Sequence, residues 1–454
     1  MLRLLFFSVI LSLLSGCAAM KQQERQQKFS ALYHKAQYQQ AAEFQLESKN
    51  SQTNDPEDLL ITLQAATALR YADDITQSNL LFDQAENILK QHHQKILLNK
   101  SVSTLSSILV NDAVLDYSGT SYDGIMLNTY KALNFWQSGN KAYARVEFNR
   151  ALDRQRRAKA LFKAEIKQQQ QAISKKGGNY ARNTNNPKVT QLVKRAYSNL
   201  YNFQAYPDFV NPFSTYLAGL FYLHDGDYAK AVDVLKEAHG MLPTQAIVEA
   251  DFKLAQALQQ GEPDPQKYAW IIFENGSAPL KTEFRIDLPL FILSRNAFYT
   301  GIALPKLVLQ KNAHPFLNIN TLDESSRTQP LASMDNVIQT DFKKRYPWIV
   351  SRALISAIAK TTAQYIAQKQ LGPWGGLAAS LLQLATTSAD IRIWSALPKE
   401  FQIAKIKLPS DNLIRISVPN KAATHIKLEA NKNQLIYIKI PKSYSPITYN
   451  SFVL

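Results

Sequence analysis

The stretch NPFSTYLAGLFYLHDGDYAKAVDVLKEAHGMLP, residues 211–243, decides the fold of the first half of the chain. Apolar and small residues recur at helical spacing on both sides of Gly226-Asp227, a pair that is typical of a tight turn. Gly219 leaves room for a second helix to approach closely, and Pro243 ends that second helix. The stretch therefore predicts two antiparallel helices joined by a short turn.

The offsets of the small and aromatic residues in 211–243 resemble the tetratricopeptide repeat, which has about 34 residues. A second copy starts near Met126, and weaker copies occur around Ala36 and Ala66. Four such units predict a curved, TPR-like helical domain over residues 17–262. An ordinary helical bundle is the alternative interpretation.

The composition changes after residues 261–265, a linker rich in turn residues. Asn275-Gly276 is a strong hairpin signal, and Pro347 is expected to interrupt a helix over 335–370 that is paired with a second helix over 377–387. The predicted strands cover residues 267–273, 280–290, 301–309, 401–408, 413–418, 425–430 and 434–440. We predict an α+β domain over 263–454 with a β-sandwich-like sheet arrangement and a helix pair, and thus an α+β protein.

The N-terminus has the pattern of a secretion signal. Leu4 to Leu14 is apolar apart from two serines, which is too short to span a bilayer. The following Leu14-Ser15-Gly16-Cys17 resembles the lipobox of bacterial lipoproteins. Cys17 is the only cysteine of the 454 residues, so it cannot form a disulfide within the chain. We predict a signal peptide at 1–16 and lipidation, such as palmitate, on Cys17.

The residue after the cysteine predicts the location. In enterobacterial-type sorting, Ala18 rather than aspartate implies transfer to the outer membrane, with the protein on its periplasmic face. The longest uncharged run, residues 370–389, contains glycines and polar residues and is a poor fit to a membrane-spanning helix. The chain is therefore expected to be attached to a membrane through lipid alone.

The formal charge of +16 is unevenly distributed. The segment 141–176 has eleven basic and three acidic residues, including Arg154, Arg156 and Arg157. Nucleic acid is not expected as a partner of a secreted protein. An anionic envelope polymer or lipid could bind this segment, and a solvated helix face is the alternative interpretation.

Catalytic motifs are missing from the sequence. The seven histidines form no metal-binding helix motif, no free cysteine remains, and no Gly-x-Ser-x-Gly or phosphate-binding glycine loop occurs. We therefore expect no enzyme activity, no cofactor and no metal site.

In tetratricopeptide arrays, the first helix of each repeat lines a concave groove that receives a partner. Eight residues are candidates for that groove: Phe213, Tyr216, Leu220, His224, Met126, Thr129, Leu133 and Trp136, the last of which falls one position short of the repeat offset. Burial of these side chains by neighbouring helices of the same chain is the alternative. The apolar helices within 349–387 likewise allow two interpretations, a domain core or a surface for self-association or membrane contact.

Several blocks resemble a family of uncharacterised proteobacterial lipoproteins with tetratricopeptide-like repeats. They are Tyr122-Asp123-Gly124, Phe273-Glu274-Asn275-Gly276, Phe284 to Leu290, Gly301 to Pro305 and Ala389 to Trp394. The resemblance covers most of the mature chain. It implies a role in the bacterial cell envelope but no defined activity. In some genomes, members lie beside lipoproteins similar to activators of peptidoglycan synthases.

The leading functional hypothesis is a lipid-anchored periplasmic scaffold that binds another envelope protein through its helical repeats. The first alternative is a binder of anionic polymer or lipid that uses the basic segment 141–176. The second alternative is a subunit of a surface or secretion assembly that self-associates through the helices within 349–387.

Overall fold

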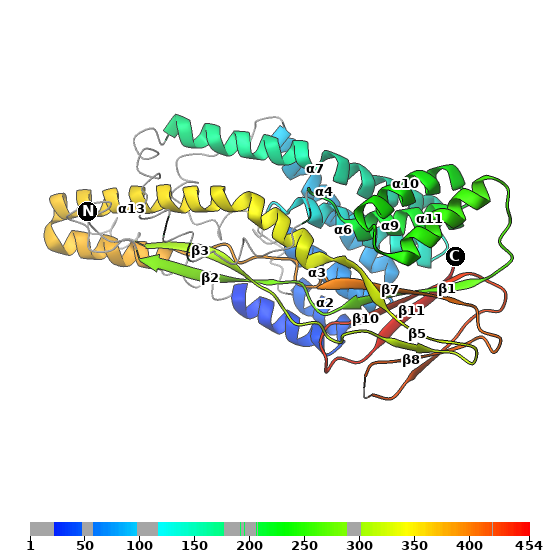
Figure 1. The fold of residues 1–454 in the computed structure, drawn as a ribbon. Coiled ribbons are helices and arrows are strands. Elements are labelled where there is room, and N and C mark those ends of the chain that lie inside the picture. The colour runs from blue at the N-terminus through cyan, green and yellow to red at the C-terminus, as the bar shows by residue number, and fades with distance from the viewer. Residues whose placement is uncertain are drawn as a thin grey trace.

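The protein, seen here as a computed structural model, has three layers: an array of helices, a five-stranded sheet and a four-stranded sheet (Figure 1). The prediction of an α+β protein is confirmed. The structure describes residues 22–47, 58–97, 117–176, 191, 195, 206, 208–287, 301–419 and 421–454. The predicted signal peptide and Cys17 lie outside the described residues.

Helical hairpins lie at all four places where the sequence repeats its pattern. A helix over residues 22–34 comes first. The helices that follow are α2 (Tyr38–Glu47), α3 (Asp58–Tyr71), α4 (Ile75–Leu97), α6 (Ser121–Gln137), α7 (Lys141–Lys176), α9 (Pro212–His224), α10 (Tyr228–Met241) and α11 (Ala246–Gln259). Contacts run from each helix of this series to the next, so the hairpins form a continuous array.

The turn between α9 and α10 forms as the sequence predicts. Gly226 has a φ of +80°, a value that glycine adopts without the steric cost of a side chain. A Cβ on Gly219 would lie 2.7 Å from the side chain of Leu235 on α10. The two glycines therefore permit the sharp turn and the close contact between the helices.

The five-stranded sheet has the order β11-β10-β1-β7-β6, and β1 is parallel to β10. Its strands are β1 (Tyr268–Asn275), β6 (Gln329–Ser333), β7 (Glu400–Lys407), β10 (Gln434–Ile440) and β11 (Thr448–Val453). The four-stranded sheet, in the order β5-β4-β8-β9, consists of β4 (Asn318–Asn320), β5 (Ser325–Arg327), β8 (Leu413–Ser417) and β9 (Thr424–Lys427).

The five-stranded sheet is buried on both faces. Successive side chains of a strand point to opposite sides, so each strand contributes to two cores. From β1, Ile271 and Phe273 pack with Ile416 and Ile438 in a core between the two sheets. Trp270 and its neighbours on the other face join the core of the helical array. The two sheets thus face each other as in a sandwich, and one core extends from the helices into the sheet.

A buried carboxylate joins the helices to this sheet. Glu274 of β1 is 0% exposed, and its Oε2 lies 2.9 Å from Nζ of Lys439 on β10. The Tyr71 hydroxyl (α3) donates to Oε2 at 2.5 Å, and the Tyr130 hydroxyl (α6) donates to Oε1 at 2.9 Å. The Tyr437 hydroxyl also donates to Oε1. Burial raises the pKa of the three tyrosines well above the ordinary value, so they remain protonated donors.

A separate two-stranded ribbon of β2 (Leu280–Asp287) and β3 (Gly301–Val308) runs beside α13 (Met334–Thr386) (Figure 1). The predicted hairpin at Asn275-Gly276 is wrong, because β1 and β2 belong to different sheets. Gly276 has a φ of +73°, but its N–H donates to the Ile440 carbonyl and the chain leaves the sheet there. The chain does turn at Gly276, as predicted. The pairing of the strands, however, is set by contacts between residues that are distant in the sequence.

The predicted interruption at Pro347 is also wrong, because α13 continues through this residue. The helix breaks at Gly372, where φ is +70°, and the two arms on either side form the helix pair. Proline lacks an N–H but has a helical φ, whereas the positive φ at position 372 requires a break.

Removal of the Lys439 charge tests the buried pair. We expect Lys439→Met to lower the free energy of unfolding by about 3–5 kcal/mol, because it leaves a buried carboxylate without its cation. Chemical denaturation of the folded chain measures this. The matched control is Lys432→Met, which removes an exposed ion pair with Glu429 and should change stability little. The double variant Glu274→Gln/Lys439→Met should recover part of the loss. Equal losses for Lys439→Met and Lys432→Met would contradict this role.

Candidate functional site

Three of the four predicted groove residues of the clearest repeat lie inside the molecule, and the fourth, His224, is partly exposed. Phe213, Tyr216 and Leu220 are each 0% exposed. The Phe213 ring stacks on that of Phe401 in the five-stranded sheet, with centroids 3.5 Å apart. His224 contacts the ring of Trp270 on β1 at 4.8 Å, and burial, together with nearby lysines, lowers its pKa to about 3.

The Tyr216 hydroxyl donates to Oδ2 of Asp251 at 2.7 Å. The same carboxylate accepts from Trp270 and from Lys405, both in the five-stranded sheet, at 3.0 and 2.7 Å. The Tyr216 hydroxyl is thus part of a hydrogen-bond network around Asp251. After the network around Glu274, this is the second buried polar contact between helices and sheet.

The four groove residues of the second copy are buried as well. Met126, Thr129 and Leu133 are 0% exposed and Trp136 is 1% exposed. The Thr129 hydroxyl is hydrogen-bonded to Ser214 on α9 at 2.6 Å. Trp136 packs edge-on against aromatic rings that include Phe452 of β11. Seven of the eight residues, all but the partly exposed His224, are thus covered by helices and sheet of the same chain, and the expectation that they line an open groove is wrong for those seven.

This burial predicts a stability effect. Leu220→Ala should lower the free energy of unfolding by about 2–5 kcal/mol, because it leaves a cavity in a packed core. Leu80→Ala on α4 removes the same atoms from a side chain that is 51% exposed and should cost less than about 0.5 kcal/mol. Thermal or chemical unfolding of both variants gives the comparison. A loss of stability for Leu220→Ala as small as for Leu80→Ala would show that Leu220 is accessible.

The three arginines proposed for an anionic surface differ in accessibility. The Arg154 side chain is only 14% exposed and contacts Glu86 at 3.5 Å, so it is a poor surface residue and that prediction is wrong for it. Arg157 is 71% exposed and pairs with Asp153 on the same helix. Arg156 is exposed. Two of the three residues thus remain available to an anion.

Other basic residues of α7 have acidic partners. The pairs are Arg145 with Asp225 and Asp227, Arg150 with Glu86 and Glu147, and Lys159 with Asp208. Four of these five acidic residues lie outside the segment, on α4, in the turn between α9 and α10 and before α9, so the charge count of the segment alone cannot reveal them. They reduce the local positive potential and weaken the case for an anion-binding face.

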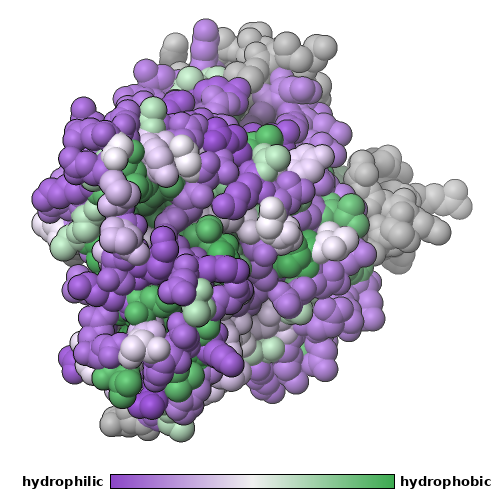
Figure 2. Space-filling view, turned by 90° about the vertical axis from the view of Figure 1, so that its right-hand side faces the viewer, coloured by the Kyte–Doolittle hydropathy of each residue, from purple (hydrophilic) through white to green (hydrophobic). Residues whose placement is uncertain are grey.

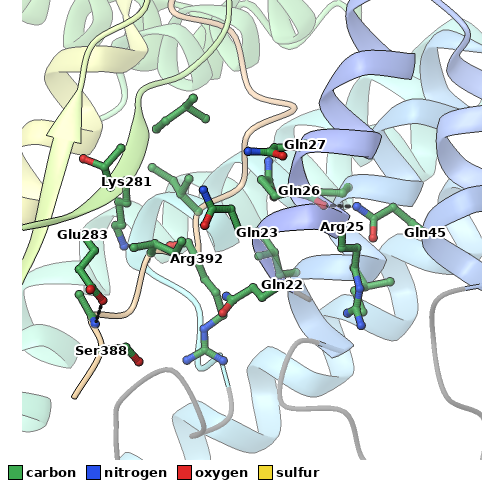
Figure 3. Close-up of a pocket in the computed structure, with 18 of the residues that line it drawn as sticks. Gln22, Gln23, Arg25, Gln26, Gln27, Gln45, Lys281, Glu283, Ser388 and Arg392 are labelled. Atoms are coloured by element: carbon green, nitrogen blue, oxygen red, sulfur yellow. Dashed lines mark hydrogen bonds between the residues drawn. The ribbon is translucent and has the colours of Figure 1, made fainter. Parts of the chain in front are cut away.

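An open cleft of about 610 Å³ lies elsewhere, between the first helices and the β2 ribbon (Figure 3). A volume of this size is typical of ligand pockets. The cleft is lined by Gln22, Gln23, Arg25, Gln26, Gln27, Gln45, Leu60, Ile61, Gln64, Leu280, Lys281, Thr282, Glu283, Arg285, Ser388, Ala389, Ile391, Arg392 and Ile393. It therefore combines an apolar floor with amide and cationic groups.

Glutamines from three helices form one wall of the cleft. The Gln64 side-chain amide donates to Oε1 of Gln26 at 3.0 Å and to Oγ of Ser395 at 3.3 Å. Gln45 donates to Oε1 of Gln64 at 2.5 Å. The buried Nε2 of Gln22 and Oε1 of Gln45 have no hydrogen-bond partner in the structure. This wall thus contains an unpaired donor and an unpaired acceptor, which a small side-chain rotation would turn toward a polar ligand.

The opposite wall is cationic and held in place by its own hydrogen bonds. Arg392 forms a two-point ion pair with Asp390, with distances of 2.8 and 3.0 Å. The Lys281 ammonium donates to the Arg392 carbonyl at 3.0 Å, and burial lowers the pKa of this lysine. Arg285 pairs with Glu283 at 2.6 Å. Glu283 lies close to Ser388 in the cleft, as Figure 3 shows. Arg392 is only 3% exposed, so Arg285 and Lys281 are the cations of this wall that could reach a carboxylate or amide group of a peptide.

The described residues form no group of three or more histidine, cysteine, aspartate or glutamate side chains that could hold a metal. Within the same part of the chain, no helix has the length and hydropathy needed to cross a membrane.

The comparisons of the chain with protein-family models, with curated proteins and with solved structures gave no match.

The sequence reasoning did not find the cleft. One local signal was present: two glutamine pairs, Gln22-Gln23 and Gln26-Gln27, recur at helical spacing. The other wall comes from residues more than two hundred positions away, so its placement depends on the tertiary fold.

The buried ion pair of Glu274 and Lys439 had a clearer signal in the sequence, since each is a charged residue within an otherwise apolar strand.

Proposed function

We propose that this protein is a lipid-anchored periplasmic scaffold that binds another envelope protein through the cleft. The anchor is Cys17, and the location is the periplasmic face of the outer membrane. The observation that carries the proposal is the position of the cleft against helix 22–34, the first described element after Cys17 (Figure 3). A partner in the cleft would therefore be held close to the membrane.

The proposal moves the partner site away from the predicted groove. The sheet of the same chain contacts Phe213, Tyr216 and Trp136, so a peptide would have to displace a packed core there. The cleft is open and offers glutamine amides beside cations. An extended peptide with amide and carboxylate groups fits this chemistry best.

The repeat assignment forms part of this proposal. The four helical hairpins, with positive φ at Ala36, Asp73, Gly139 and Gly226 in their turns, support TPR-like units. Membership of the lipoprotein family with such repeats is proposed on the same sequence blocks. In this view the sheet occupies the surface that a partner fills in other repeat arrays.

Lipid attachment is tested by metabolic labelling. We expect a labelled fatty acid on the chain in growing bacteria and its loss in Cys17→Ser, because no other thiol exists in the sequence. Ser15→Ala, one position before the small residue that precedes Cys17, serves as a control and should keep the label. Unchanged labelling of Cys17→Ser would overturn the anchor.

Partner binding is tested by photocrosslinking in intact bacteria. A photoreactive residue at Gln23 or Thr282, which are exposed at the edge of the cleft, should give an adduct with one envelope protein. The same residue at Lys236, exposed on α10 and absent from the cleft, is the control. Adducts of equal yield from all three positions, or none from the cleft, would contradict the proposed site.

A further inference from the structure

The turn of α13 exposes an unusual number of large apolar side chains. Among the described residues, five of the fourteen exposed large hydrophobic residues lie within positions 365–377. They are Tyr365, Ile366, Leu371, Trp374 and Leu377, exposed by 41%, 48%, 38%, 80% and 42%. Figure 1 shows this turn at the far end of the yellow and orange helix pair, away from the two large sheets.

Near the turn, polar side chains lie between the two arms of the helix pair. Thr361 and Gln364 of the first arm and Ser380 and Gln383 of the second are at most 6% exposed. The Gln364 amide donates to the Gln383 side chain between the arms. Close to the turn, polar contacts between the arms and apolar residues outside reverse the usual arrangement in water, as in helices that contact lipid.

The turn itself is built to be compact. Gly372 has a φ of +70°, and a Cβ on Gly375 would lie 2.6 Å from the Ala367 carbonyl oxygen. These two glycines let the second arm begin directly after the first. As a result, Leu371 and Trp374 project from the same end of the molecule.

The part of the helix pair that extends toward the turn carries charge of one sign. Residues 342–389 contain no aspartate or glutamate and six lysines or arginines. Lys369 is exposed beside the turn, among the apolar residues. The opposite end of the molecule differs, since the face in Figure 2 is mainly hydrophilic and its hydrophobic residues form small separate areas. An apolar, aromatic tip without acidic groups complements the interface of an anionic bilayer.

We propose that the turn of α13 inserts into the headgroup region of a bilayer that contains anionic phospholipid. Trp374, Leu371 and Leu377 enter the interface, and Lys369 contacts lipid phosphates. The insertion is shallow, because within the described residues no helix can span a membrane. With the lipid on Cys17, this gives the protein a second membrane contact that fixes its orientation.

Vesicle sedimentation tests the insertion without the lipid anchor. The chain from Ala18, which contains every described helix and strand, is mixed with phosphatidylglycerol/phosphatidylethanolamine vesicles or with phosphatidylcholine vesicles. We expect stronger binding to the anionic vesicles. Trp374→Ser should weaken that binding by about tenfold, since it removes the largest apolar group of the tip. Because Cys17 is absent, failure of the lipidation proposal would not affect this result.

The matched control is Tyr444→Ser, which also removes an exposed aromatic ring, 67% exposed, but distant in sequence from the helix pair. It should bind vesicles as the unchanged chain does. Lys369→Glu should weaken binding to anionic vesicles only. Equal binding of the Trp374→Ser variant and the unchanged chain would overturn the proposal.

Sedimentation equilibrium tests whether a second copy of the chain covers the tip instead. If the chain forms an oligomer in solution and Trp374→Ser dissociates it, the tip is a contact between copies, and this result would also overturn the proposal.

Discussion

The buried carboxylate of Glu274 constrains the arrangement of the whole molecule. A charge with no exposure to water is stable only if partners surround it, and here the partners come from two layers. Tyr71 and Tyr130 reach it from the helices, whereas Tyr437 and Lys439 reach it from the sheet. Helices α3 and α6 can therefore not slide or separate from β1 and β10 without exposing or isolating the charge. This requirement holds the sheet against the helical array.

That arrangement limits where the protein can act. The sheet covers one side of the helical array, whereas the cleft beside helix 22–34 and the turn of α13 are accessible. The cleft offers amides and cations to a polar ligand, and the turn offers apolar side chains to a membrane. A scaffold attached through Cys17 and through the turn would present the cleft in a defined orientation. The two proposals are physically independent, since they use different residues and different ligands.

The sequence predicts what depends on neighbours along the chain. The hairpin around Gly226, the approach of Leu235 to Gly219 and most strands follow from local spacing and turn chemistry. The sequence does not predict which elements meet. The groove residue Tyr216 is buried because Asp251 and a distant strand bond to it, and β1 pairs with β10 rather than with the strand after Gly276. Several acidic partners of the basic helix α7, such as Glu86 and Asp225, are likewise distant in the sequence.

The central claim is that the helical array and the five-stranded sheet form a single cooperative unit. Native-state hydrogen exchange at low denaturant concentration tests it most directly, because it measures the opening free energy of each segment separately. The account predicts that amides of α6, around Tyr130, and of β1, around Glu274, exchange with the same opening free energy. Exchange of α6 at a clearly lower free energy than β1 would mean that the helices open without the sheet, and would contradict the account.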